Sequence, residues 1–547
     1  MNQYLVKIYA ILMVLVINLP VIIIQNPPTT FEEIGSKNNL GNANNKIISI
    51  PQDNEKSNVI LQSFYWAVPN GSWYNTIASR MNEISNLGFT YIWLPPPSKT
   101  YGPGLPESNG LQVGYEPYDY YDLGEYNQQG SIITRYGSKA DLLNLINLAN
   151  NTNISVMADI VLNHNRGGTP YPDGKNFTDV KSGLFLRNAS DFDCGDGPAF
   201  TDNATLGTHF PDLCTTNLYV RNEILKWGHW LYDDIGYRGW RFDYTIGYNA
   251  STVKAWVDAI GGLSMVEYWQ NDVNSIMNYL SNVPDVTKAL DFPLMYTFID
   301  LFSRNGNFPF KNIVNPSTSV LMTNPKRAVT FVDNHDTVRT PYNNIALHRD
   351  FMYAFILLYD GGTPAVFWKD LYPDDPCFDP TGTCAMQNDL NAQDLKLNLR
   401  KLLEIRKDYA QGTGEIIYSD NDLFIYQRDS QPGLILAMND NPNAVRTATF
   451  STKYSNTILY DLTGKGHALK VDEQGKITIQ VPPLSYLVYS QTNNLSSDII
   501  TEIGLYTASA TATTTTGFSI FDSLTILFSS FAVLGIVNLK KKKKNFD

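Results

Sequence analysis

The sequence predicts an α/β fold, a (β/α)8 barrel with a domain inserted after its third strand and a separate C-terminal antiparallel β-sandwich. Between residues 58 and 411, short apolar segments alternate with amphipathic ones, which is typical of parallel strands joined by helices. Residues 165–216 follow the third apolar segment and are rich in Gly, Asp, Asn and Pro. From 412 to 492 the pattern changes to short alternating strands, such as Leu423–Gln427 and Leu434–Met438.

Eight apolar segments are the expected barrel strands, the number that closes such a barrel. They are Val59–Trp66, Phe89–Leu94, Ile154–Leu162, Tyr237–Asp243, Leu263–Trp269, Lys288–Phe292, Ala328–Asp333 and Pro364–Trp368. Amphipathic segments between them predict helices, among them Trp73–Asn86, Lys139–Ala149, Val220–Asp234 and Asp350–Tyr359. An open doubly wound sheet is the alternative, but it needs a Gly-rich phosphate-binding turn after its first strand, and none follows Trp66.

The charge of the chain argues against nucleic acid as a partner. The 547 residues carry a formal net charge of −12. Residues 540–547 hold five Lys and one Asp, or +4, so the rest of the chain carries −16. Nucleic-acid binding needs a basic surface, and no basic stripe lies outside this tail. Aromatic residues make up 12%, and their planes suit stacking on sugar rings, although large cores use them too.

The two ends predict a secreted protein held at the outer face of the cell membrane. Residues 1–24 contain an apolar run typical of a secretory signal or an N-terminal anchor, and 25–57 form a linker. A Ser/Thr-rich stalk at 493–517 precedes an apolar stretch at 518–539 that is long enough to cross a bilayer. The basic tail at 540–547 should stay cytoplasmic, which puts the body outside. A helix packed on the barrel is the alternative for the apolar stretch.

Four cysteines fit an oxidising compartment. Their even number and spacing suggest two disulfides, Cys194–Cys214 and Cys377–Cys384. Zinc bound by Cys214 together with His209 is the alternative, which leaves a second metal near Cys214 open. No CxxC pair or third ligand accompanies these two residues.

Acidic and polar side chains follow four of the expected strands. They are Asp159, Asn163 and His164 after the third strand, Arg241 and Asp243 after the fourth, Glu267 and Trp269 after the fifth, and Asp333, His335 and Asp336 after the seventh. Active sites of such barrels lie at the C-terminal ends of the strands, and buried carboxylates are costly unless they are paired or used. These residues therefore predict an active site at the barrel mouth; ion pairs that only brace the mouth are the alternative.

Spacing assigns roles to two of the carboxylates. Arg241 and Asp243 lie two residues apart on one strand and share a face. A guanidinium beside a carboxylate lowers the carboxylate's pKa and keeps it ionised, as a nucleophile requires. Glu267, on the neighbouring strand, has apolar and aromatic neighbours on both sides, which raise a carboxyl's pKa and suit an acid. Retaining glycoside hydrolysis uses two such carboxyls ~5–5.5 Å apart, and this pair is expected at that separation.

The same segments resemble the signature regions of the α-amylase family, glycoside hydrolase family 13, from about Val59 to Tyr489. The sequences QSFYW from Gln62, GYRGWRFDY from Gly236 and DFPL from Asp291 are most similar to plant and archaeal α-amylases. The resemblance implies a catalytic barrel, a domain B after the third strand and a C-terminal β domain. It implies endo-hydrolysis of α-1,4-glucosidic bonds in starch- or glycogen-type α-glucans, with retention of configuration.

The resemblance also implies roles for individual residues. Asp243 would be the nucleophile, Glu267 the general acid/base, and Asp336 the third carboxylate, which grips the 2- and 3-hydroxyls of the sugar. The substrate-binding residues that it implies are Tyr115 in GYEP, His164, Arg241, Trp269 and His335.

A calcium site follows from the same comparison. Asn163, Asp202 and Asp212 match side-chain ligands, while Thr205 and Gly247 match positions that lend backbone carbonyls. An all-oxygen set with two carboxylates suits a hard cation such as Ca²⁺, which would join domain B to the barrel. Ordinary turn chemistry is the alternative for the two Asp residues.

One position departs from the family pattern. Where relatives usually have Lys or His after the nucleophile, this chain has Ile246, at a position that normally contacts sugars on the leaving-group side. Two alternatives therefore remain on the same barrel, an α-glucanotransferase or an oligosaccharide-specific α-glucosidase. A catalytically inactive binding partner is the third, and the intact Asp243, Glu267 and Asp336 argue against it.

Overall fold

The computed structural model describes residues 58–102, 112–170, 174–195, 210–304, 306–339, 348–376 and 392–495. Several parts of the chain discussed above lie outside these ranges. They are the predicted leader, the linker, the pair Cys377–Cys384, the stalk beyond residue 495, the apolar stretch 518–539 and the basic tail. Within them, no helix combines the length and the apolar character needed to cross a membrane.

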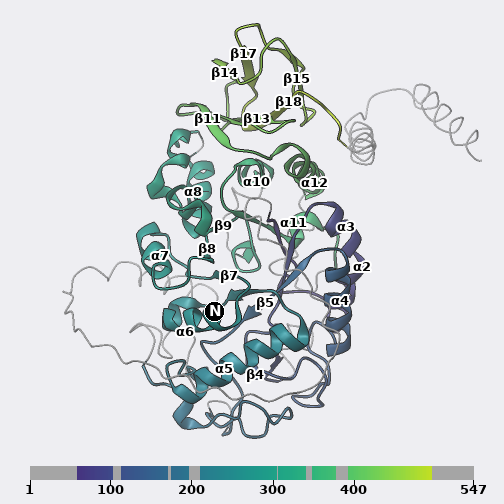
Figure 1. Cartoon of the computed structure of the whole chain (residues 1–547), viewed down its shortest axis with the longest axis vertical. Coiled ribbons are helices and arrows are strands. Elements are labelled where there is room, and N and C mark those ends of the chain that lie inside the picture. The colour runs from purple at the N-terminus through teal and green to yellow at the C-terminus, as the bar shows by residue number, and fades with distance from the viewer. Residues whose placement is uncertain are drawn as a thin grey trace, which may run out of the picture. The chain divides into compact units, whose positions relative to one another are not determined.

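Eight parallel strands close a barrel, which confirms the predicted fold class (Figure 1). In barrel order they are β1 (Ile60–Gln62), β10 (Thr363–Phe367), β9 (Ala328–Phe331), β8 (Thr287–Leu290), β7 (Leu263–Val266), β6 (Gly239–Phe242), β5 (Ser155–Ile160) and β2 (Tyr91–Leu94). Each lies within or beside its expected segment. They are shorter than the apolar segments because ladder pairing ends before the polar residues at the barrel mouth.

Helices surround the barrel strands (Figure 1). They are α2 (Trp73–Ser79), α3 (Met81–Asn86), α4 (Lys139–Asn151), α5 (Leu218–Trp230), α6 (Ala250–Ile260), α7 (Val273–Leu280), α8 (Phe292–Ser303), α9 (Val320–Thr323), α10 (Arg349–Leu358), α11 (Trp368–Leu371) and α12 (Ala392–Tyr409). The helix expected over Trp73–Asn86 is two helices that meet at Arg80. Arg80 pairs with Asp375 and lies over the rings of Trp368 and Tyr372. The sequence around Arg80 does not indicate these contacts.

The barrel core is built from fully buried strands and a layer of aromatic side chains. All residues of β6 and β10 are buried. Trp240 of β6 packs edge-to-face on Trp256 of α6, which in turn packs on Trp227 of α5. Buried strands with helices on their outer face are the arrangement that parallel sheets require. This packing fixes the strands whose C-terminal ends carry the polar residues.

The segment after β5 is held by a disulfide and short bridges. Cys194 and Cys214 form a disulfide with their Cα atoms 5.5 Å apart, as predicted. His164 bridges to Asp212, and Phe192 bridges to Leu213. The disulfide excludes a zinc-bound thiolate at Cys214 in this structure. The predicted limits of the domains themselves remain a prediction.

The C-terminal part is antiparallel. One sheet has the order β11 (Gly414–Ser419), β12 (Leu423–Arg428), β13 (Leu434–Asn439), β18 (Ser485–Ser490), β15 (Ile458–Asp461) and β16 (Leu469–Lys470). A second pairs β14 (Arg446–Ser451) with β17 (Lys476–Val481). A separate apolar cluster that includes Ile425, Ile435 and Ile479 joins the two sheets. Phe424 of this part contacts Phe355 of α10.

Candidate active site

Strand register brings the predicted carboxylates together. Asp159 of β5 pairs with Arg241 of β6, and Phe242 of β6 pairs with Val266 of β7. Asp243 and Glu267 are the next residues after that second pair, so they leave neighbouring strands at the same level. The sequence predicts this adjacency because both strands end at the same edge of the barrel.

Arg241 is the centre of the candidate site. Its Nη1 lies 2.7 Å from Asp243 Oδ1 and 2.8 Å from Asp159 Oδ1, and its Nη2 lies 2.6 Å from Glu267 Oε1. The predicted Arg241–Asp243 contact is therefore confirmed. Three carboxylates share one guanidinium, and its side chain is only 1% exposed. A single cation cannot balance three buried negative charges, so protonation of one of the three carboxylates is favoured. Arg241, Asp159, Asp243 and Glu267 are called the Arg241 group below.

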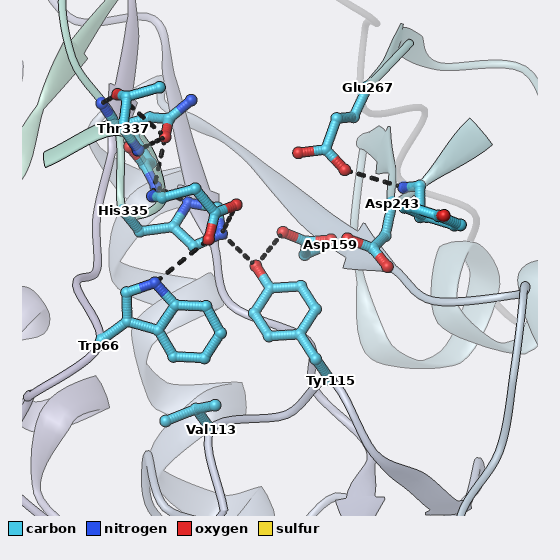
Figure 2. A network of polar contacts seen from close by, with 12 residues as sticks. Trp66, Val113, Tyr115, Asp159, Asp243, Glu267, His335 and Thr337 are labelled. Atoms are coloured by element: carbon cyan, nitrogen blue, oxygen red, sulfur yellow. Dashed lines mark hydrogen bonds and ion pairs between the residues drawn. The ribbon is translucent and has the colours of Figure 1, made fainter. Parts of the chain in front are cut away.

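Two carboxyls of the group have strongly raised pKa values. Burial raises the pKa of Glu267 to about 8; the nearby Arg241 opposes this rise, and the charges of Asp243 and Asp336 add to it. Burial likewise raises the pKa of Asp159 to about 7, again against the effect of Arg241. Glu267 Oε2 also accepts a hydrogen bond of 2.9 Å from the backbone N–H of Tyr244 (Figure 2). The sequence-based expectation of a raised pKa for Glu267 is confirmed.

A second set of contacts connects Asp336 to the same site (Figure 2). Gln62 Nε2 lies 2.6 Å from His335 Nδ1, so the imidazole accepts there and carries its proton on Nε2. That Nε2 lies 2.8 Å from the Tyr115 hydroxyl and 3.3 Å from Asp336 Oδ2. The Tyr115 hydroxyl donates in turn to Asp159 Oδ2, at 2.9 Å. Imidazole and phenol thus form a continuous hydrogen-bonded chain to Asp159.

Exposure separates the carboxylates that a substrate can reach from those that it cannot. The side chain of Asp336 is 27% exposed, that of Asp243 is 11% exposed and that of Glu267 is 7% exposed. Asp159 is fully buried. The three predicted catalytic residues are therefore the ones that remain partly open, while Asp159 is an internal partner of Arg241 and Tyr115.

The remaining predicted sugar-binding residues, His164 and Trp269, contact other parts of the protein. His164 is buried, which lowers its pKa, and its Nε2 lies 2.9 Å from the Tyr115 carbonyl oxygen, so the ring donates there. Trp269 donates from Nε1 to the Tyr296 hydroxyl at 2.9 Å and stacks on Phe292. Both partners of Trp269 belong to α8.

Part of the expected calcium site lies within the described residues. Asn163 Oδ1 is buried and meets no hydrogen-bond donor among the residues that the structure describes, and a Cβ on Gly247 would lie only 1.9 Å from it. The Asn163 carbonyl accepts from Leu213 N–H, which places Asp212 next to it. A buried amide oxygen beside the Asp212 carboxylate and a glycine backbone fits a hard cation.

Two of the expected calcium ligands, Asp202 and Thr205, lie outside the described residues. Among the residues that are described, no three His, Cys, Asp or Glu side chains are grouped to hold a metal. Three expected ligands lie within the described residues: Asn163, Asp212 and Gly247. They fit the cation but do not complete its coordination.

Sequence reasoning missed the contribution of the first strand. Trp66 donates from Nε1 to Asp336 Oδ1 at 3.2 Å, and its ring lies 5.4 Å from that of Tyr115. Gln62 sets the tautomer of His335, as described above. Neither residue is acidic, so a search for charged strand ends overlooks both. The signal that could have found them is their place at the C-terminal end of a barrel strand.

Comparisons with known proteins agree with this geometry. The family described as "Alpha amylase, catalytic domain" matches residues 44–173, and "Alpha-amylase C-terminal" matches 434–490. The α-amylase of Bacillus licheniformis is 25% identical over 502 residues, which cover 79% of this chain and 93% of that protein. The chloroplastic alpha-amylase 3 of Arabidopsis thaliana is 28% identical over 342 residues, which cover 58% of this chain and 36% of that protein.

Solved structures share the fold. An α-amylase from Geobacillus thermoleovorans complexed with acarbose has a TM-score of 0.59 at 17% identity, covering 80% of this chain and 98% of that one. CldA, a cyclomaltodextrin glucanotransferase, has a TM-score of 0.60 at 19% identity, covering 80% and 99%. Because both a hydrolase and a transferase share it, the fold alone does not separate these two activities.

Proposed function

The chain belongs to the α-amylase family, glycoside hydrolase family 13, and on this premise we propose that it cleaves α-1,4-glucosidic bonds within starch- or glycogen-type chains with retention. The observation that carries the proposal is Arg241, which contacts both Asp243 and Glu267 while the pKa of Glu267 is raised to about 8. One carboxylate next to one carboxylic acid is the pair that a retaining glycosidase uses.

In the first step, Asp243 attacks the anomeric carbon of the sugar and the bond from that carbon to the glycosidic oxygen breaks. Glu267 donates its proton to the departing oxygen, so the leaving chain is released as an alcohol and Glu267 becomes a carboxylate. The glycosyl unit is then an ester of Asp243. Both carboxyls contact one guanidinium, which supports the shorter carboxyl separation that a covalent intermediate needs.

In the second step, Glu267 takes a proton from a water molecule, and the oxygen of that water attacks the anomeric carbon. The ester bond to Asp243 breaks, and the carboxylate of Asp243 returns. Two inversions at the same carbon leave the α-configuration of the product unchanged. Arg241 and the Tyr244 N–H stabilise Glu267 while it is ionised between the steps.

The remaining residues would orient the sugar. Asp336, held by Trp66 and His335, is the carboxylate proposed to bind two ring hydroxyls in the distorted sugar. Tyr115 offers its ring face, since its hydroxyl is already engaged with Asp159 and His335. His164 would donate to the same sugar only after releasing the Tyr115 carbonyl. These roles rest on the family resemblance together with the contacts described.

Calcium is proposed as the cofactor. Asn163, Asp212 and Gly247 would hold it, together with Asp202 and Thr205. Bound there, the ion would supply structural cross-linking between the segment after β5 and the turn after β6, not chemistry at the sugar. Asp243 lies four residues before Gly247, so the ion would stiffen the turn that follows the nucleophile.

Two further features bear on the proposal. Ile246 is apolar where relatives usually carry a cation, so the leaving-group side offers less affinity and glucanosyl transfer is the second candidate.

The proposed location is the outer cell surface, and it rests on the apolar runs at both ends of the sequence and on the Cys194–Cys214 disulfide.

Digestion of soluble starch tests the proposed function. The wild-type protein should lower the viscosity and iodine colour well before reducing ends accumulate, because internal bonds are cut. Asp243→Asn should reduce turnover by more than about 10³-fold, since no glycosyl-enzyme can form. Asp258→Asn, on the exposed face of α6, is the matched control and should keep the wild-type rate. Larger or cyclic glucans as main products would instead support transfer, and wild-type activity in Asp243→Asn would contradict the assignment.

A further inference from the structure

A buried arginine lies behind the turn that carries Asp336. Arg349 begins α10 and is buried. Its Nη1 lies 3.0 Å from Asp370 Oδ1 and 3.7 Å from Asp333 Oδ2. Asp333 follows β9, and Asp370 lies in α11 directly after β10. One guanidinium therefore connects the segments that follow two neighbouring barrel strands, β9 and β10.

Asp333 is in turn the anchor of the turn at 333–337. Its Oδ1 accepts from Thr337 Oγ1 at 2.5 Å and from Asn334 N–H at 2.9 Å. Asn334 Oδ1 accepts from the backbone N–H of Asp336 and of Thr337, at 2.8 and 2.9 Å. Figure 2 shows Thr337 and His335 on this turn, next to the site. Asn334, Asp336 and Thr337 are thus tied to the Asp333 carboxylate directly or through Asn334.

We propose that Arg349 is a positioning residue for catalysis, which fixes the orientation of Asp336 through Asp333 and the 333–337 turn. The inference rests on the proposed function, in which Asp336 binds the sugar in its distorted state. Arg349 itself does not touch the sugar. Its effect reaches the reaction through one turn, so its loss misplaces Asp336 and leaves the direct contacts of Arg241 with Asp243 and Glu267 in place.

Burial makes this arrangement sensitive to the guanidinium. Burial raises the pKa of Asp333 to about 7, the neighbouring Asp370 adds to the rise, and Arg349 opposes it. Without Arg349, the repulsion between Asp370 and the largely buried Asp333 loses the charge that opposes it, and taking up a proton becomes more favourable. A protonated Asp333 accepts the Thr337 and Asn334 hydrogen bonds less strongly, so the turn loosens.

If Arg349 only stabilised the barrel, its replacement should act as the loss of any other buried arginine does. Arg327, which directly precedes the same strand β9, is an equally buried arginine at the opposite end of the barrel. It contacts Asp285 at 3.0 Å and the carbonyls of Thr287, Leu280 and Pro284. Arg327→Met therefore serves as the matched control for the loss of a buried guanidinium far from the turn.

The experiment is a double-mutant cycle on full-length protein with a maltooligosaccharide substrate. Arg349→Met should lower kcat about 10–100-fold with KM changed less than about 3-fold, because misplacement of a group by ~1 Å costs that much. Arg349→Lys should restore most of the rate. When Asp336→Asn is already present, adding Arg349→Met should lower kcat by less than about 2-fold further, since the effect of Arg349 passes through Asp336. Arg327→Met should lower the melting temperature and keep kcat.

Several outcomes overturn the proposal. They are a folded Arg349→Met protein with wild-type kcat, or a full-size loss in the Asp336→Asn background. If Arg349→Met does not fold, Thr337→Val carries the test, because it removes the Oγ1 contact to Asp333 within a similar volume. It should lower kcat about 3–10-fold, and wild-type kcat in a folded Thr337→Val protein would refute the idea. An Asp336→Asn protein as active as wild type would instead refute the proposed function.

Discussion

At the scale of single residues, the chemistry depends on how one guanidinium is shared. Arg241 faces Asp159, Asp243 and Glu267 together, so the group cannot hold all three carboxylates ionised without a large cost. The raised pKa values of Glu267 and Asp159 are the consequence. A proton is therefore retained within the group near neutral pH, and its place on Glu267 is what the first step of hydrolysis requires.

The raised pKa of Glu267 predicts the alkaline limit of activity. Glu267 must be protonated to donate to the leaving oxygen, so kcat/KM should fall as the pH rises through about 8. Initial rates on a short maltooligosaccharide between pH 4 and 10 measure this limb. Arg241→Lys, which cannot contact the carboxylates through two nitrogens, should shift it. A limb below about pH 6 in the wild type would contradict the described environment.

The same shift has a consequence for stability. The folded pKa of Glu267, about 8, lies above its ordinary value of 4.5, so the folded state holds the extra proton across that interval. Stability should then decrease as the pH rises from about 4.5 to 8. Glu267→Gln removes this loss, and thermal unfolding should show a higher melting temperature than wild type at pH 8 but not near pH 4.5. Equal melting temperatures at pH 8 would count against it.

At the scale of elements, the proposed calcium site lies between the segments that follow β5 and β6. Asn163 Oδ1 lies against Gly247 and meets no donor within the described part of the chain, and Asp212 is adjacent in the next segment. Removing Ca²⁺ with a chelator should lower the melting temperature by several degrees, because the segment after β5 then loses its link to the barrel.

The matched variants separate this site from a general chelator effect. Asn163→Ala should have a melting temperature that no longer responds to Ca²⁺, whereas Asn282→Ala, on the surface, should respond as the wild type does. Thermal unfolding by circular dichroism, with and without chelator, gives the readout independently of activity. A wild-type melting temperature that the chelator leaves unchanged would contradict the proposed site.

The elements themselves were largely predictable because their cause is local. Barrel strands such as Ala328–Phe331 and Thr363–Phe367 are continuous apolar runs, as strands buried on both faces must be. The break at Arg80 was not predictable, because the partners of its side chain, Asp375 and Trp368, follow β10 and are distant from Arg80 in the sequence.

The site divides in the same way. Asp243 and Glu267 could be found from the sequence because acids at strand ends are rare and costly. Arg349 and Trp66 could not, since their partners lie on other strand ends and only the closed barrel brings them together. Local pattern therefore predicts which residues are polar at the mouth, while register determines which of them meet.

At the scale of the whole molecule, the proposed substrate is a neutral polymer. The net charge of −12 neither attracts nor repels a glucan, so recognition depends on hydrogen bonds and ring contacts at the barrel mouth. The C-terminal sheet packs on the outer face of α10 through Phe424 and Phe355, while the first residue of α10 holds the Asp336 turn. One helix therefore contacts both the second domain and the support of the site.

The central claim is that Asp243 and Glu267 cleave an α-glucan by double displacement. The most direct measurement is the anomeric configuration of the first product, followed by proton NMR during the first minutes of hydrolysis of a maltooligosaccharide, before mutarotation. Double displacement predicts that the new reducing end appears as the α-anomer and only later equilibrates with the β-anomer. A β-anomer formed first would mean a single displacement by water, and it would contradict the assignment of Asp243 as nucleophile.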